Sequence, residues 1–121
     1  MKALSSLEWL ITELLSAWRA MWVIVMFDLP TVTKKEKRRY TQFRKLLLEE
    51  GFSMMQFSIY GRHHPTREKA ETKIWRITQN IPLQGEIRIL RVTEAQFARM
   101  EVFSNYRRRP PEREPPQLEL W

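Results

Sequence analysis

The clearest pattern along the chain is an apolar run, residues 22–28 (WVIVMFD), that ends in a single carboxylate, Asp28. The β-branched and aromatic side chains of this run favour a β-strand. Because apolar residues occupy nearly every position rather than every second one, we expect a central strand covered on both faces. Pro30 ends that strand, since proline cannot donate a hydrogen bond to a neighbouring strand.

A helical pattern follows the proline. Thr33 and Glu36 have the spacing of a capping box, in which each side chain accepts a hydrogen bond from the other residue's backbone amide. The helix is expected to continue to about Glu50, where Gly51 supplies the left-handed conformation that commonly ends a helix. A stripe at helical spacing predicts the face that packs on the core, and it consists of Tyr40, Phe43 and Leu47.

The rest of the pattern predicts a sheet with two helices. We expect two short strands, split around Gln56, in residues 52–61, then a helix over residues 65–79 and a strand over residues 85–93. The helix is expected to turn Ala70, Ile74 and Ile77 toward the core. The strand over residues 85–93 is expected to carry Arg88 and Arg91 on one side. A short helical turn and an edge strand follow in residues 94–106. The order βαββαβ predicts an α+β sandwich of the ferredoxin-like type, with both helices on one face of an antiparallel sheet.

Two segments flank this domain. Residues 3–20 are predicted to form an amphipathic helix whose apolar stripe needs a covering surface. Three interpretations stay open: an interaction helix, ordinary packing on the parent domain, or an upstream extension if translation begins at Met21. We therefore divide the chain into a helical extension (1–20), a ferredoxin-like domain (21–104) and a proline-rich tail (105–121).

The tail ends in alternating apolar residues. Four prolines predict an extended conformation for residues 105–121, and the final residues read QLELW. An alternating segment can add to an exposed sheet edge, where its apolar side chains fill pockets. We expect Leu118, Leu120 and Trp121 to dock in this way on a partner protein.

The charge of the chain indicates a polyanionic partner. Lys and Arg total 21 against 14 acidic residues, which gives a net charge of +7 and a pI near 10.1. Nucleic acid is the first candidate and an anionic membrane the second, while a charge that serves only solubility is the plainer alternative. The expected phosphate contacts are Lys34, Lys35, Lys37, Arg38, Arg44, Lys45, Arg62, Arg67 and Arg88. No apolar run is long enough to span a bilayer. Of the two candidates we expect nucleic acid, and no membrane partner.

Candidate chemistry centres on Asp28. A carboxylate at the end of a buried strand is either a functional group or a turn residue that accepts backbone hydrogen bonds. One carboxylate is a weak magnesium site, because Mg²⁺ prefers several oxygen ligands.

His63 and His64 are expected to face solvent in a loop. The chain has no cysteine, which excludes disulfides and fits a cytoplasmic protein.

Several stretches together resemble one family. VIVMFDLPTVTKKEKRRYTQFRKLLLEEGFSMMQFSIYGR, followed by VTEAQFARM, is similar to the CRISPR-associated Cas-two family in its type II form. The resemblance extends from about Met21 to about Phe103. The first 20 residues and the proline-rich tail lie outside the common pattern.

This resemblance implies a homodimer that takes part in spacer acquisition. In that role it would bridge two dimers of the Cas-one integrase and hold a DNA duplex. The resemblance also implies an alternative, a Mg²⁺-dependent endonuclease on RNA or duplex DNA, in which Asp28 is both the catalytic and the metal-binding acid and pairs across the dimer axis. A third interpretation, independent of the resemblance, is a basic RNA-binding module of the same fold.

Overall fold

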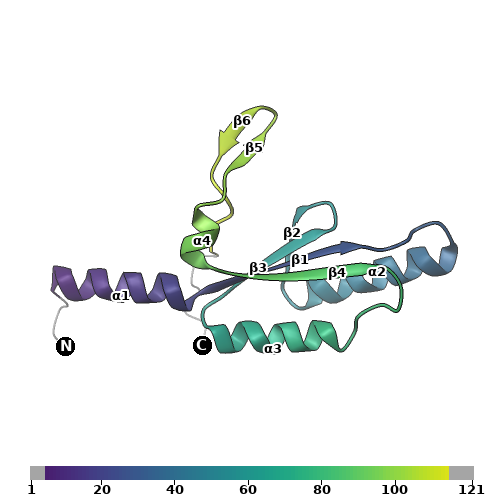
Figure 1. Cartoon of the computed structure of the whole chain (residues 1–121), viewed down its shortest axis with the longest axis horizontal. Helices are drawn as coiled ribbons and strands as arrows, with labels where there is room; N and C mark the ends of the chain where they lie inside the picture. Colours follow the sequence, from purple (N-terminus) through teal and green to yellow (C-terminus); the bar gives the residue numbers. More distant parts are fainter. Residues whose placement is uncertain (1–4, 115–121) are drawn as a thin grey trace.

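The computed structural model describes residues 5–114, apart from the side chains of residues 13 and 15–18. Its elements are α1 (Ser6–Arg19), β1 (Met21–Asp28), α2 (Lys34–Glu49), β2 (Ser53–Gln56), β3 (Ile59–His64), α3 (Arg67–Thr78), β4 (Glu86–Thr93), α4 (Glu94–Ala98), β5 (Val102–Ser104) and β6 (Arg107–Arg109). Figure 1 shows their arrangement, with α1 projecting from one end of the sheet and the β5–β6 hairpin rising from α4.

The main sheet has the ferredoxin-like topology that the sequence predicts. Its strand order is β2-β3-β1-β4, and β1 pairs antiparallel with both β3 and β4. The central position of β1 explains its continuous apolarity, because both of its faces lie under other parts of the protein. Only Met26 and Asp28 of this strand are not buried.

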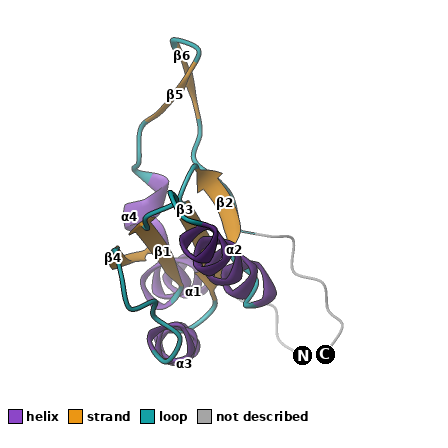
Figure 2. Cartoon of the chain, turned by 90° about the vertical axis from the view of Figure 1, so that its right-hand side faces the viewer, coloured by secondary structure: helices purple, strands orange, loops and turns teal. Residues whose placement is uncertain are grey.

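One face of the sheet, which we call the helix face, packs against α2 and α3 (Figure 2). Alternate residues of β1 point this way, and Phe43 and Leu47 of α2 meet them as the predicted stripe requires. From α3, the predicted residues Ala70, Ile74 and Ile77 are buried in the same cluster. The capping box of Thr33 and Glu36 is confirmed, since each side chain accepts from the other's backbone amide.

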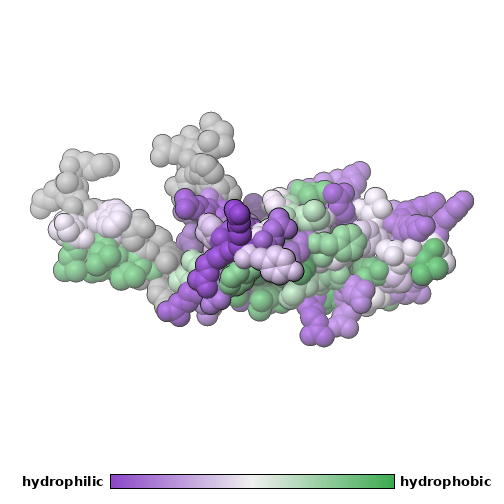
Figure 3. Space-filling model, turned by 90° about the horizontal axis from the view of Figure 1, so that it is seen from above, coloured by the Kyte–Doolittle hydropathy of each residue, from purple (hydrophilic) through white to green (hydrophobic). Residues whose placement is uncertain are grey.

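The opposite face, which we call the open face, has much less cover. It contains Trp22, Ile24 and Met26 of β1, and α4 lies over one end of it. Phe97 of α4 stacks on Trp22 with ring centroids 4.0 Å apart and planes at 9°. Further along the same face Leu90 is 45% exposed. Figure 3 shows hydrophobic side chains over the middle of the molecule and along α1 at the left.

The structure corrects three of the expectations. Arg88 and Arg91 lie on opposite faces, because Arg88 is opposite Met26 of the open face and Arg91 is opposite Val23 of the helix face. Side chains alternate along a strand, so residues three apart cannot share a side. The histidines are also misjudged: His63 and His64 belong to β3, and His64 is only 1% exposed.

The third correction concerns the edge strand expected in residues 101–106. The predicted edge strand is β5, but it pairs with β6 in a separate two-stranded hairpin instead of joining the main sheet. Asn105 and Tyr106 form its turn with φ of 53° and 65°, as in a type I′ turn. The boundary expected after residue 104 falls within this turn.

The N-terminal helix forms as predicted. Ser5 caps it, since its hydroxyl accepts a hydrogen bond from the Glu8 amide at 3.1 Å. Its apolar stripe is uncovered in the described part of the chain, with Leu7, Ile11 and Leu14 each about half exposed or more. Among the described residues, no helix is long and apolar enough to cross a membrane.

Candidate metal and nucleic-acid sites

Asp28 lies exposed at the end of β1, directly opposite Glu86 at the start of β4. Residues opposite each other on paired strands have Cβ atoms about 4.5–5.5 Å apart and share a face. Both carboxylates therefore belong to the open face. Arg88, two residues further along β4, forms an ion pair with Glu86.

Gly85 fixes the approach of the two strand ends. Its φ of +89° is a conformation that residues with a side chain rarely adopt. A Cβ atom at this position would lie 2.6 Å from the backbone oxygen of Asp28 and 2.6 Å from a methyl carbon of Leu29. The glycine thus allows β4 to begin close against the residue that carries the candidate acid.

The two acids border a depression of about 390 Å³. Its lining combines the strand ends with the β2–β3 turn, and comprises Met26, Phe27, Asp28, Phe57, Ser58, Ile59, Glu86 and Arg88. Oxygen ligands in an open, hydrated setting are those that Mg²⁺ prefers. Sequence reasoning missed Glu86, because no strand pairing was predicted; the ferredoxin-like topology, which places residues 85–93 beside the first strand, is the signal that could have found it.

The predicted basic residues of α2 are all exposed: Lys34, Lys35, Lys37, Arg38, Arg44 and Lys45. Four of them occupy the first turns of the helix. Within residues 5–114 no acidic side chain forms an ion pair with Lys34, Lys35, Lys37 or Arg38, whereas Lys45 lies 3.9 Å from Glu49. The N-terminal part of α2 therefore presents positive charge that nearby acids do not neutralise.

Two of the predicted arginines make structural hydrogen bonds. Arg44 donates from Nε to the hydroxyl of the buried Tyr60 at 2.8 Å. Arg62 is half-buried and donates to the backbone oxygen of Glu50 at 2.6 Å, just beyond the C-terminal end of α2. That bond satisfies one of the carbonyls that a helix end leaves unpaired.

The remaining predicted residues do not join the α2 surface. Arg67 is exposed at the first position of α3, and Arg88 lies on the open face, across the sheet from α2. Leu118, Leu120 and Trp121 lie outside the described residues.

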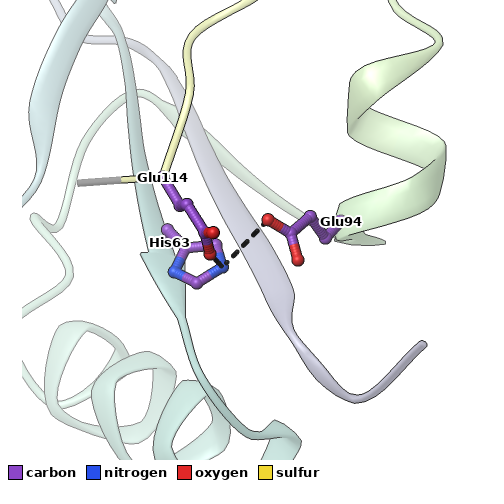
Figure 4. A group of neighbouring side chains, drawn as sticks. All are labelled: His63, Glu94 and Glu114. Carbon is purple, nitrogen blue, oxygen red and sulfur yellow. Dashed lines mark ion pairs between the residues drawn. The ribbon is translucent and has the colours of Figure 1, made fainter. Parts of the chain in front are cut away.

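A second polar cluster, which sequence reasoning did not predict, lies at the opposite end of β1. His63 Nε2 is 3.6 Å from an oxygen of Glu94 and 3.4 Å from an oxygen of Glu114 (Figure 4). The ligand atoms of all three side chains lie within 4.8 Å of one another. Burial lowers the pKa of His63, although the charge of Glu114 opposes this change.

His64, next along β3, points to the other face and lies near Phe52. Burial, reinforced by the positive charge of Arg62, lowers the pKa of His64 to about 4. The imidazole is therefore neutral at physiological pH and acts as part of the core. Neighbouring histidines thus have different surroundings because β3 turns them to opposite sides.

Comparison with known proteins identifies a family. A family model described as CRISPR associated protein Cas2 matches residues 21–100. The chain belongs to the Cas2 family. The match covers β1 to α4, so it includes Asp28, Glu86 and the α2 surface, and it ends before the hairpin.

Relatives support this membership. A CRISPR-associated endoribonuclease Cas2 from Parvibaculum lavamentivorans is 48% identical over 101 residues, covering 84% of this chain and all of the relative. A protein of the same name from Flavobacterium psychrophilum is 46% identical over 109 residues, which cover 88% of this chain and 93% of the relative. A solved structure described as a crystal structure of Cas2 is 16% identical with a TM-score of 0.47, and covers 84% of this chain and 98% of that one.

Proposed function

We propose that this Cas2-family protein serves CRISPR adaptation as a basic homodimer, which bridges dimers of the Cas-one integrase and binds the duplex DNA to be integrated. The observation that carries the proposal is the unneutralised positive charge at the start of α2. Lysines and arginines of this kind bind phosphates without reading sequence, as a protein that binds duplexes of many different sequences requires.

The local structure of α2 strengthens its attraction for phosphate. A helix N-terminus carries partial positive charge, which adds to that of Lys34 and Lys35. Glu36, the acid of the first turn, accepts hydrogen bonds from the amides of Val32 and Thr33, and these bonds lower its pKa. Its charge is thereby directed to the helix cap, away from the lysines around it.

The apolar surface of the open face favours a second copy of this chain as the partner that covers it. Apolar side chains extend along it from Trp22 to Leu90, beyond the part that α4 covers. A face that is self-complementary about a two-fold axis is the usual basis of a homodimer. In such a dimer the basic helices, which pack on the helix face, would remain outside and accessible to DNA.

The test reverses charge on α2. The variant Lys34→Glu/Arg38→Glu/Lys45→Glu is expected to bind duplex DNA at least tenfold more weakly at moderate salt, whatever the sequence. Each phosphate contact removed lowers the slope of log affinity against log salt by about 0.9. The measurement is fluorescence anisotropy of a labelled duplex over a salt series.

A matched control variant distinguishes loss of a specific DNA-binding surface from a general effect of lower net charge. Lys69→Glu/Arg99→Glu/Arg113→Glu changes the charge equally at exposed positions away from α2. The control should retain most of the parent's affinity and slope. Equal losses in both variants would mean that binding follows net charge alone, and an unchanged slope in the α2 variant would mean that DNA lies elsewhere.

A second candidate function is a Mg²⁺-dependent endonuclease. The adjacent carboxylates of Asp28 and Glu86 favour it, as do the names of the relatives. Mg²⁺ would be held by Asp28 and Glu86, with the partner subunit's Asp28 as a further ligand if the two-fold axis passes there. When bound, the ion supplies Lewis-acid activation of water, while Arg88 is suitably placed to pair with a phosphate.

Cleavage and binding distinguish the two functions. Asp28→Ala is expected to abolish any Mg²⁺-dependent cleavage of RNA or duplex DNA, while it leaves duplex binding nearly unchanged. Asp28 is exposed and belongs to neither core cluster, so folding should survive. Cleavage at the parent's rate by the variant would remove Asp28 from the mechanism, and preferential binding of single-stranded RNA would favour the RNA-binding module.

The tail remains a proposed docking segment for the integrase. Deleting residues 115–121 should weaken co-elution with the integrase in size-exclusion chromatography without changing the homodimer. Loss of the homodimer with full integrase binding would assign the segment to the dimer instead.

A further inference from the structure

The cluster of His63, Glu94 and Glu114 joins three parts of the chain that are distant in sequence. His63 lies near the end of β3, Glu94 is the first residue of α4, and Glu114 ends the described chain after the hairpin (Figure 4). His63 pairs in register with Trp22, six residues before Asp28 on β1. At about 3.3 Å per residue this places the cluster roughly 20 Å from the candidate magnesium site.

Within the cluster, the side chain of His63 lacks a hydrogen bond. His63 Nε2 is buried and has no hydrogen-bond partner among residues 5–114. It nevertheless points toward two carboxylates, and the side chain of His63 is only 11% exposed. Two carboxylates that converge on one imidazole nitrogen provide oxygen ligands on the same side as that nitrogen, and a cation bound there would reduce their mutual repulsion. Within the described residues, Glu114 has no ion-pair partner other than His63.

The distances from His63 Nε2 can be compared with the ligand separations that different cations require. Tetrahedral Zn²⁺ with bonds of about 2.0–2.2 Å separates its ligand atoms by about 3.3–3.5 Å. Octahedral Mg²⁺ with bonds of about 2.0–2.1 Å separates adjacent ligands by only about 2.8–3.0 Å. The two separations from His63 Nε2, 3.6 Å and 3.4 Å, are nearer to the tetrahedral values, and all three ligand atoms lie within 4.8 Å of one another. Imidazole is also a ligand for zinc rather than for magnesium.

We propose that His63, Glu94 and Glu114 form a Zn²⁺ site, completed by water, which fastens residues 110–114 to β3 and α4. Two carboxylates and a neutral imidazole balance the charge of the ion. The lowered pKa of His63 is consistent with this role, because only the neutral imidazole has a free electron pair to donate. Bound zinc would fix the position and direction in which the chain leaves the domain.

Isothermal titration of the metal-free full chain with Zn²⁺, in excess Mg²⁺, tests the site. We expect one ion per chain and affinity at least tenfold weaker in both His63→Gln and Glu114→Gln. Co²⁺ should give the visible absorption typical of tetrahedral coordination. Glu114→Gln changes an exposed residue, so the metal-free variant should melt at the parent's temperature even if His63→Gln is unstable.

Two control variants make the result specific. Glu112→Gln alters an acid of the same segment outside the cluster, and Asp28→Asn alters the distant acid; both should bind Zn²⁺ as the parent does. As a second readout, Zn²⁺ should slow tryptic cleavage after the exposed Arg113 in the parent but not in Glu114→Gln. Absence of saturable binding, or equal affinity in all variants, would overturn the proposal, as would a loss in Asp28→Asn.

Discussion

The two faces of the main sheet consist of alternate residues of the same strands, yet they have different roles. On the helix face, Val23 and Val25 are fully buried against α2 and α3. On the open face, Ile24 and Trp22 are buried only where neighbouring strands and α4 reach them. The candidate chemistry follows the same division, since Asp28, Glu86 and His63 all belong to the open face.

This difference shows how one strand serves both folding and function. The helix face contains the larger core cluster, so it supplies most of the apolar burial that stabilises the fold. The open face can therefore carry polar groups and leave apolar surface for a partner at little cost to the monomer. The basic residues occupy a third location, the outer surface of α2, where they interfere with neither face.

The largest difference in stability is expected between two leucine-to-alanine variants, one on each face of the sheet. Leu47→Ala removes a side chain with no exposure from the helix-face core and should lower the free energy of unfolding by about 2–5 kcal/mol. Leu90→Ala, which is 45% exposed on the open face, should cost less than about 1 kcal/mol in dilute protein. Chemical denaturation of both variants provides the measurement.

Protein concentration sharpens this test. If a second copy covers the open face, the cost of Leu90→Ala should rise as the protein is concentrated, because association stabilises only the folded state. The cost of Leu47→Ala should not change in this way. Equal costs for the two leucines at every concentration would mean that the faces do not differ as described.

The second-largest loss of stability is expected at Gly85, beside the strand end that carries Asp28. Gly85→Ala should destabilise the protein by about 1–3 kcal/mol, because the new Cβ is strained at positive φ and meets the Asp28 backbone oxygen. Gly51→Ala is the control, since its φ is also positive but its Cβ would meet only the flexible Arg62 side chain at 3.2 Å. A smaller loss is expected for Gly51→Ala, and equal losses would mean that the close approach at Asp28 contributes nothing.

Local elements of this fold could be predicted from the sequence because their signals are local. Thr33 and Glu36 define the start of α2 within four residues, and the stripe that contains Phe43 and Leu47 defines its buried face. The apolar run before Asp28 identified the central strand. The element order then led to the ferredoxin-like topology, since few arrangements of these elements cover such a strand on both sides.

The candidate sites were less predictable because they depend on strand register and distant contacts. Asp28 and Glu86 are far apart in sequence and meet only through the pairing of β1 with β4. The grouping of His63, Glu94 and Glu114 needs the path of the chain after the hairpin, for which no local pattern exists. The common side expected for Arg88 and Arg91 was a different kind of error, since alternation along one strand already excludes it.

These two arginines provide the finest test of the division between the faces. Arg91 makes two hydrogen bonds to Glu71 of α3, at 2.6 Å and 3.1 Å, although both side chains are nearly half exposed. Arg91→Ala should therefore cost about 0.5–1 kcal/mol of stability, the upper range for surface ion pairs. Arg88→Ala should cost almost nothing, because its pair with Glu86 is more exposed and lies within one strand. A double-mutant cycle with Glu71→Ala isolates the Arg91 contribution, and it should vanish at high salt. If Arg88→Ala proves the more destabilising variant, Arg88 contributes to the structure of the open face, and its assignment as a phosphate contact loses its basis.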